Sequence, residues 1–270
     1  PKAWQDFDTE GQNTGLEDGE KGDFFALTST PGQALAVLES LKIRRLYLPA
    51  DAVFSENWKP VWSSVSERKS ADPGFSLFLT LPVILRSYSE GYLEELEKWL
   101  REDPKGVGTD GIMACSLSGL TWLRRIGWKG KIALQHTAYV FNQKTHDFYR
   151  KYFGADSYTA SLELNRRELE ALPVKDREMV VYGRAPMMIS AGCVKKTAGL
   201  CSLLRTQENL FLSAKAVSPS KEEEVFCLQD RYQACFPVRI DCRHCMNTIY
   251  NSVPLSLHQY IEEIKACGVR

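Results

Sequence analysis

Short apolar runs recur along the chain and alternate with segments whose apolar residues follow a helical period. Leu93, Leu96 and Leu100 show that period between two of the runs. Each run has the length and composition of a buried strand. We expect strands at Phe24–Thr28, Leu46–Leu48, Phe75–Leu81, Gly111–Cys115, Ile132–Leu134, Ser157–Ser161 and Met179–Tyr182. Strands that alternate with helices need crossover connections, so the pattern predicts a mostly parallel sheet.

The strand spacing fits two α/β architectures, a closed (β/α)8 TIM-like barrel and an open doubly wound sheet. The chain has 270 residues and a barrel typically needs ~250, so length favours the barrel. A helix expected from Leu255 to Cys267 is followed by Gly268, Val269 and Arg270, where the alternation requires another strand. We therefore expect a (β/α)8 barrel that lacks its last strand within this sequence.

The beginning of the chain lacks the alternating pattern. Residues 1–22 are polar without an apolar period, which predicts a linker or tail. Residues 23–270 are expected to form one barrel domain, with an excursion at 193–245 after the seventh strand. The start has neither an initiator Met nor a secretion signal, so we interpret the sequence as a piece of a longer polypeptide.

Composition excludes several classes of protein. Apolar residues make up 44% of the chain, and 34 basic residues balance 34 acidic ones. These values exclude global disorder and a highly basic nucleic-acid coat protein. No stretch of ~18 apolar residues predicts a membrane span, so no membrane partner is expected. Eight cysteines are too few for a disulfide-stapled secreted scaffold of this size, which favours the cytoplasm.

Four cysteines fall into two pairs on either side of the excursion. Cys193 and Cys201 precede it, and Cys242 and Cys245 follow it. Four thiolates in this arrangement suit a tetrahedral sulfur site that holds Zn²⁺ or an iron–sulfur cluster. The seven residues between the first two exceed the ~2–4 of a zinc knuckle, which favours a 4Fe–4S cluster, with zinc as the alternative.

Other interpretations of the cysteines stay open. Cys242 and Cys245 alone have the spacing of a redox pair, and all four are compatible with ordinary buried thiols. Cys227 and Cys235 are expected to be packing residues, with Cys235 as a reserve ligand.

Three segments resemble peptidase U32, the collagenase-like peptidases, whose members include RNA- and quinone-ring-hydroxylating proteins. They are Val181–Ser190, Leu228–Arg231 with Phe236–Val238, and Cys242–Ser252. Glu178 matches the family's opening Glu, whereas Pro186 stands where the family has a Cys. The resemblance implies a barrel in which a further strand follows Arg270. In hydroxylating members such cysteines hold an iron–sulfur cluster, which here would use Cys193, Cys201, Cys242 and Cys245.

Polar residues that follow the predicted strands are candidates for the site, because barrel active sites form at the carboxyl ends of the strands. Cys115 and His136 follow consecutive strands and are the candidate catalytic dyad of a protease. The candidate substrate-binding residues are Gln135, Glu163, Asn165, Tyr182, Arg184, Arg231, Asn247, Tyr250 and Asn251.

Two further groups of residues bear on whether the chain binds RNA. Lys195 and Lys196 fit a phosphate track, although Glu222–Glu224 interrupts that region. Tyr149, Tyr152 and Phe153 are expected to be a core stripe of a helix and not a platform for stacked bases.

The expected function is an iron–sulfur-dependent hydroxylation of an RNA base or an aromatic metabolite. The alternatives are a collagenase-like protease and a zinc-stapled binding module without catalysis. The partners expected are RNA, a protein or peptide substrate, and the remaining parts of the same polypeptide.

Overall fold

The computed structural model describes residues 24–86, 89–103, 106–172, 176–199, 201 and 226–269. The predicted tail at 1–22 and most of the predicted excursion, residues 202–225, lie outside these residues. Within the described ranges, no helix has the length and apolar character that a membrane span requires.

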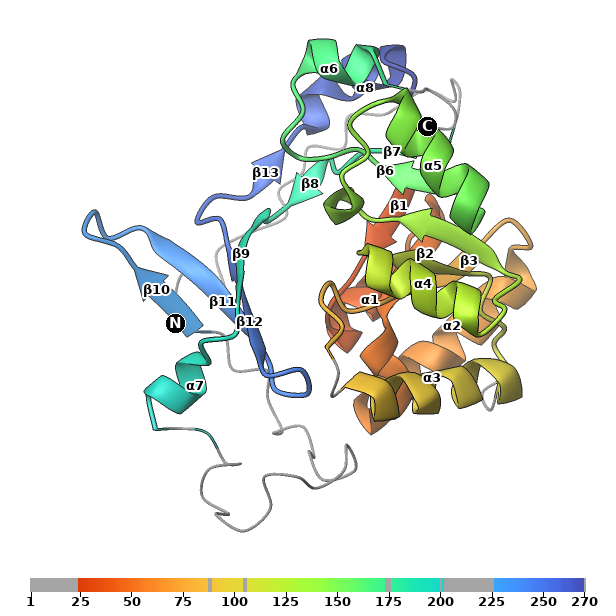
Figure 1. Cartoon of the computed structure of the whole chain (residues 1–270), viewed down its shortest axis with the longest axis horizontal. Coiled ribbons are helices and arrows are strands. Elements are labelled where there is room, and N and C mark those ends of the chain that lie inside the picture. The colour runs from red at the N-terminus through yellow and green to blue at the C-terminus, as the bar shows by residue number, and fades with distance from the viewer. Residues whose placement is uncertain are drawn as a thin grey trace.

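A curled parallel sheet forms the body of the molecule (Figure 1). Its strands follow the chain order without interruption and all neighbours run parallel. They are β1 (Phe24–Leu27), β2 (Ile43–Pro49), β3 (Ser76–Thr80), β4 (Gly111–Ala114), β5 (Lys131–Leu134), β6 (Ser157–Thr159) and β7 (Arg177–Glu178). The predicted α/β class is confirmed, and the sheet has the half-barrel form consistent with a TIM-like barrel. The eighth strand stays a prediction.

Helices cover the outer face of this sheet (Figure 1). They are α1 (Pro31–Leu38), α2 (Lys59–Ala71), α3 (Glu90–Glu102), α4 (Leu117–Arg125), α5 (Gln143–Phe153), α6 (Arg166–Glu170) and α8 (Ile261–Ala266), with short 3₁₀ turns η2 (Ala50–Phe54), η3 (Glu56–Trp58), η5 (His136–Ala138) and η8 (His258–Tyr260). At the start of α1, the Thr30 side chain accepts a hydrogen bond from the Gln33 amide, and Pro31 occupies the first turn. This is the cap that the Thr-Pro pair predicts.

Alternate residues of each strand build two separate apolar layers. Leu46 and Leu48 of β2 belong to the large core under the helices. Tyr47, between them, points to the opposite side and packs with Phe78, Met113 and other interior residues. Gly111 lies beside Phe78 in the strand register, and a Cβ there would stand 2.2 Å from the Phe78 ring. The interior therefore requires glycine at the first position of β4.

A polar network closes the concave side of the sheet. The Glu178 carboxylate of β7 accepts hydrogen bonds from Arg45 Nη1 at 2.7 Å, from Tyr47 Oη at 2.9 Å and from Ser157 Oγ at 2.9 Å. The Arg45 guanidinium also lies over the Phe78 ring. β2 and β7 are five places apart in the sheet, so their direct contact shows how strongly the sheet curls.

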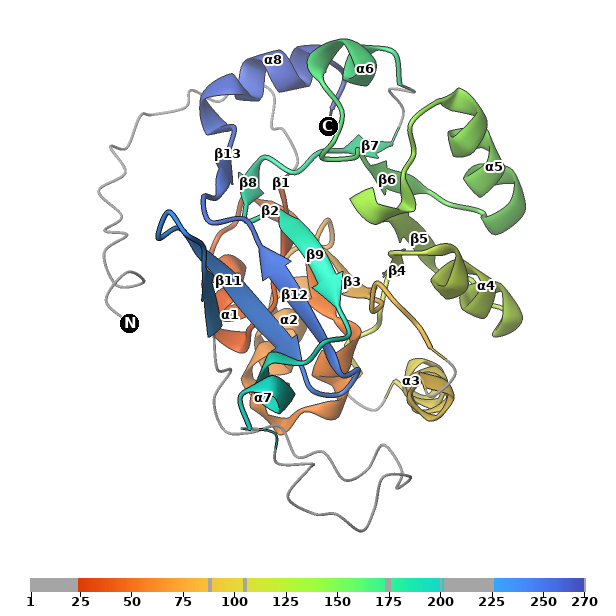
Figure 2. The same cartoon turned by 60° about the vertical axis from the view of Figure 1, so that its left-hand side comes forward.

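A second, antiparallel sheet follows the body. Its order is β10 (Phe226–Gln229), β11 (Cys235–Asp241), β12 (Met246–Tyr250) and β9 (Pro186–Ser190). A two-stranded sheet of β8 (Tyr182–Gly183) and β13 (Leu255–Ser256) connects it to the barrel side. Figure 2 shows the antiparallel sheet in front of β1, β2 and β3, with the short helix α7 (Val194–Thr197) at one end.

Three sequence predictions change in this part of the chain. The strand predicted at Met179–Tyr182 is wrong: the charged pair Arg177–Glu178 just before it forms the parallel strand β7, and of the predicted residues only Tyr182 lies in a strand, the antiparallel β8. The helix predicted from Leu255 begins only at Ile261, after β13 and η8. Cys227 and Cys235 form a disulfide between β10 and β11, and are not the packing residues or reserve ligand expected.

Candidate functional site

The turn between β11 and β12 carries one of the two predicted cysteine pairs. β11 ends at Asp241 and β12 begins at Met246, so Cys242 and Cys245 lie in the turn. The Asp241 carboxylate accepts a hydrogen bond from the His244 amide at 2.9 Å. Cys245 adopts the left-handed conformation, with φ of 47°. These features shape a tight turn that holds both thiols at one end of the antiparallel sheet.

The other cysteine pair lies on the neighbouring strand connection. Ser190 of β9 pairs with Asn247 of β12, so the chain that leaves β9 passes the cysteine turn. Asn247 is 1% exposed and its side-chain amide donates to the Gly192 carbonyl at 2.7 Å. This bond fixes the backbone beside Cys193, which is the residue before α7, and Cys201 follows that helix.

Electrostatics show that the two pairs share one environment. Burial raises the pKa of both Cys242 and Cys245, and the nearby thiols of Cys193 and Cys201 raise it further. Lys195 acts in the opposite direction on the Cys242 thiol. Charge–charge effects decline with distance, so Cys193 and Cys201 lie in the neighbourhood of the cysteine turn, and all four thiols are free. Among the described residues, no three cysteine sulfurs lie within 4.8 Å of one another.

Two side chains of the cysteine turn attach it to the barrel. Arg243 Nε lies 3.3 Å and His244 Nε2 3.6 Å from Asp51 Oδ1. Asp51 follows the carboxyl end of β2 directly, within η2. The His244 ring also meets the Tyr92 ring of α3 edge-on, with centroids 4.9 Å apart. The turn of Cys242 and Cys245 therefore lies at the carboxyl end of β2, the end of a TIM-like barrel at which active sites form.

Asp51, Asp241 and His244 bring possible metal-ligating atoms within 4.8 Å of one another. Burial alone would lower the pKa of His244, but the nearby carboxylates of Asp51 and Asp241 raise it overall. Arg243 already pairs with Asp51 at 3.3 Å, and Asp241 accepts the His244 amide. We interpret this group as an ion-pair anchor for the turn.

The predicted substrate-binding residues of the antiparallel sheet are scattered. Tyr250 and Asn251 lie at the far end of β12 from the cysteine turn. Arg184 donates to the backbone carbonyls of Asn251 and Ser252, which gives it a structural role. Arg231 lies in the β10–β11 turn, at the opposite end of β11 from Cys242. Of this set, only Asn247 reaches the cysteine site.

The remaining candidates lie around the barrel. Gln135 is buried after β5 and its side-chain oxygen accepts from Thr137 Oγ1. Asn165 is the N-cap of α6, where its side chain accepts from the Arg167 and Glu168 amides in a capping box. Glu163 is exposed in the preceding loop, and Tyr182 is exposed on β8. The structure does not bring these four to the cysteines.

The candidate protease dyad lacks an activated thiol. Cys115 is 1% exposed and donates to the Leu81 carbonyl at 3.0 Å, and burial raises the pKa of its thiol far above the ordinary value. Burial also lowers the pKa of His136. A nucleophilic cysteine needs a depressed pKa and access to substrate, and Cys115 has neither.

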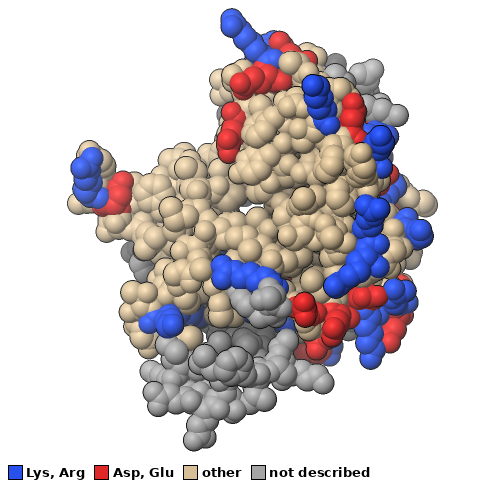
Figure 3. Space-filling model, viewed as in Figure 1, with Lys and Arg blue, Asp and Glu red and all other residues tan. Residues whose placement is uncertain are grey.

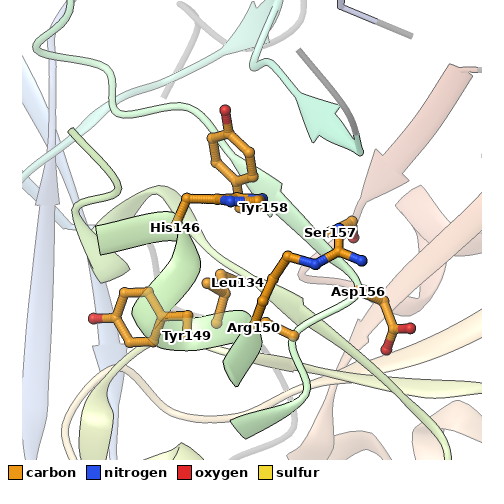
Figure 4. Close-up of a pocket in the computed structure, with 8 residues that line it drawn as sticks. Leu134, His146, Tyr149, Arg150, Asp156, Ser157 and Tyr158 are labelled. Atoms are coloured by element: carbon orange, nitrogen blue, oxygen red, sulfur yellow. The ribbon is translucent and has the colours of Figure 1, made fainter. Parts of the chain in front are cut away.

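A small pocket lies between α5 and the strands β5 and β6 (Figure 4). Its lining includes His146, Tyr149, Arg150 and Tyr158. Its volume is about 10 Å³, which is room for roughly one water molecule. It cannot hold a substrate.

The sequence pattern did not predict the buried polar contacts between segments that are far apart in the chain. Asp51 follows the second predicted strand at its carboxyl end, and that position was a usable signal. Tyr92 directly precedes Leu93 in a predicted helix, and the pattern gave no sign of its contact with His244. Glu178 was noted as a family match, but its contacts with Arg45 and Tyr47 span 133 and 131 residues and leave no local pattern.

The chain was compared with known proteins. No family model matches it, and no curated protein matches it. Among solved structures it is similar to the spore cortex-lytic enzyme SleL of Bacillus cereus, at 10% identity and a TM-score of 0.41, over 94% of this chain and 71% of that one. SleL of Bacillus megaterium QM B1551 gives 11% identity and a TM-score of 0.39, over 92% and 69%. At these values the likeness carries no argument about function.

Proposed function

We propose that this chain is a U32-type enzyme that uses an iron–sulfur cluster to hydroxylate an RNA base or an aromatic metabolite. The observation that carries the proposal is that Cys193 and Cys201 lie near the turn of Cys242 and Cys245, which Arg243 anchors at the carboxyl end of β2. The segments that resemble U32 support it, because they lie in β8–β12 and their connections, around these cysteines.

The four sulfurs are not arranged as a preformed tetrahedral zinc site. A tetrahedral Zn²⁺ with Zn–S bonds of ~2.3 Å brings its sulfurs to about 3.8 Å from one another. Among the described residues, no three of these sulfurs come within 4.8 Å. A cubane binds each cysteine through a different iron and so holds its ligands further apart. The set of four cysteine donors suits a 4Fe–4S group.

When bound, such a cluster supplies one-electron transfer. The chain's own residues hold its ligands in place: Asn247 fixes the backbone before Cys193, and Asp51 pairs with the cysteine turn. The four thiols lose their protons when they bind metal. Because burial and mutual proximity raise the pKa of Cys242 and Cys245, loading is expected to become less favourable at lower pH.

Anaerobic purification, followed by iron and sulfide analysis and absorption spectroscopy, tests the proposal. We expect brown protein with about four irons and absorption near ~400 nm. Cys193→Ala should lose both. Cys267→Ala is the matched control, because Cys267 is also a free, partly buried thiol but lies outside the site. Colourless protein with one zinc would instead identify a zinc-stapled module.

A further inference from the structure

Two pairs of exposed aromatic rings lie in the segment that follows β5 and on α5. Tyr139 and Phe141 stack at the start, with ring centroids 5.5 Å apart, and Phe148 and Tyr152 lie one helical turn apart on α5, with centroids 5.1 Å apart. Each of the four is between 41% and 51% exposed. Tyr152 was expected to be core, whereas only Tyr149 and Phe153 of that predicted stripe pack against the core. We call these four residues the aromatic row.

Basic side chains are frequent in the part of the chain that carries the aromatic row, on α5 itself and around the neighbouring helix α4. Between Gly111 and Gly154 the chain has seven Lys or Arg and a single acidic residue, Asp147, although the whole chain is neutral. The basic residues are exposed, and they are Arg124, Arg125, Lys129, Lys131, Lys144, Arg150 and Lys151. Figure 3 shows blue side chains down this flank, over α4 and α5, and red ones around the neighbouring α3.

Most of these cations are available to a ligand. Among the described residues, no carboxylate lies within ion-pair distance of Arg124, Arg125 or Lys144, whereas Arg150 pairs with Asp176 at 3.0 Å. Lys151 lies over the Tyr152 ring, 5.4 Å from its centroid. A cation beside an exposed ring is an arrangement that can hold a phosphate and a base together.

We propose that the aromatic row and its cations bind single-stranded nucleic acid. Flat rings give bases a surface for stacking, and clustered cations follow the phosphates. A lipid surface fits less well, because α5 has the sequence QKTHDFYRKYF and no aliphatic residue to insert. A second copy of this chain would bring two basic surfaces together. This inference does not depend on the metal centre.

Fluorescence anisotropy of the whole chain with labelled 12-nucleotide RNA and DNA of equal sequence tests the proposal and separates the two sources of the ligand. We expect binding that weakens as salt rises. Phe148→Ala and Tyr152→Ala should each weaken binding about fivefold or more, the scale of one lost stacking contact. Arg124→Ala with Arg125→Ala should lower the slope of log K against log[salt] by roughly 1.4.

Matched control variants distinguish binding at this surface from nonspecific binding elsewhere on the protein. Tyr232→Ala removes an exposed ring from the β10–β11 turn, and Lys98→Ala removes a cation from the acidic helix α3. Both should bind as the wild type does. Equal loss in these controls, or no binding by the wild type at low salt, would overturn the proposal. The proposal would also be overturned if polyglutamate or anionic vesicles compete with the oligonucleotides and bind equally well to the variants that lack the rings.

Discussion

The parallel body and the antiparallel sheet are held together by different forces. Nearly all the buried apolar residues belong to the body, and among the described residues of the antiparallel sheet only Val238 and Met246 join that set. The antiparallel sheet depends instead on the Cys227–Cys235 disulfide, the amide of Asn247 and the ion pairs to Asp51. A small sheet with little core needs such cross-links, and a metal centre at its end would add another.

The largest effect is expected in the interior of the body. Glu178→Gln removes the charge that balances Arg45, and we expect a loss of roughly 3 kcal/mol in the free energy of unfolding, because a buried cation is left uncompensated. Denaturant unfolding measures it. Glu263→Gln is the control, since it breaks an ion pair of similar length, 2.8 Å, at an exposed position. If both variants lost the same free energy of unfolding, the interior network would stabilise the fold no more than the exposed ion pair does.

A pair of identical substitutions compares the two regions directly. Val65 of α2 and Val238 of β11 are both fully buried, and truncation of either to Ala should cost about 2 kcal/mol. Hydrogen exchange should show less protected amides throughout the parallel sheet in Val65→Ala. In Val238→Ala it should show them only in β9–β12. If Val238→Ala also exposed the amides of β2–β5, the two sheets would unfold as one unit.

The smallest effect concerns the anchor of the cysteine turn. Because its pKa is raised, His244 contributes stability below its ordinary pKa of about 6.5, and the contribution is lost as pH rises through the folded-state pKa. Asp51→Asn should lower the His244 pKa and cost about 1 kcal/mol at pH 6. NMR titration of the imidazole in metal-free protein measures the change in the His244 pKa. Asp147→Asn, beside His146, should leave the His244 pKa unchanged.

Apolar periodicity was sufficient to find six strands of the body close to their observed places. Runs such as Phe75–Leu81 are buried on both faces, so their composition alone identifies them. The seventh strand was misplaced because Arg177 and Glu178 are charged yet buried. Arg177 donates to the backbone carbonyls of Leu169 and Cys267, which replace the water it loses.

The candidate site was harder to predict than the fold. The four cysteines were chosen from spacing because paired thiols are typical of zinc and iron–sulfur sites, and their role as metal ligands stays a prediction. The polar residues around them could not, since a side chain such as Asn165 serves a helix cap as readily as a ligand. Arg231 and Asn251 are close to the cysteines in sequence, but extended strands carry them to the other end of the sheet.

The ion pair between Arg45 and Glu178 also bears on how the chain is made. A ribosome that adds ~5–20 residues per second needs on the order of ten seconds to reach Glu178 after Arg45 emerges. During that interval the guanidinium has no carboxylate partner on β7, so the nascent half-barrel must keep its concave side hydrated or shielded. A truncated translation product that ends before β7 should therefore be a good client for chaperones and proteases.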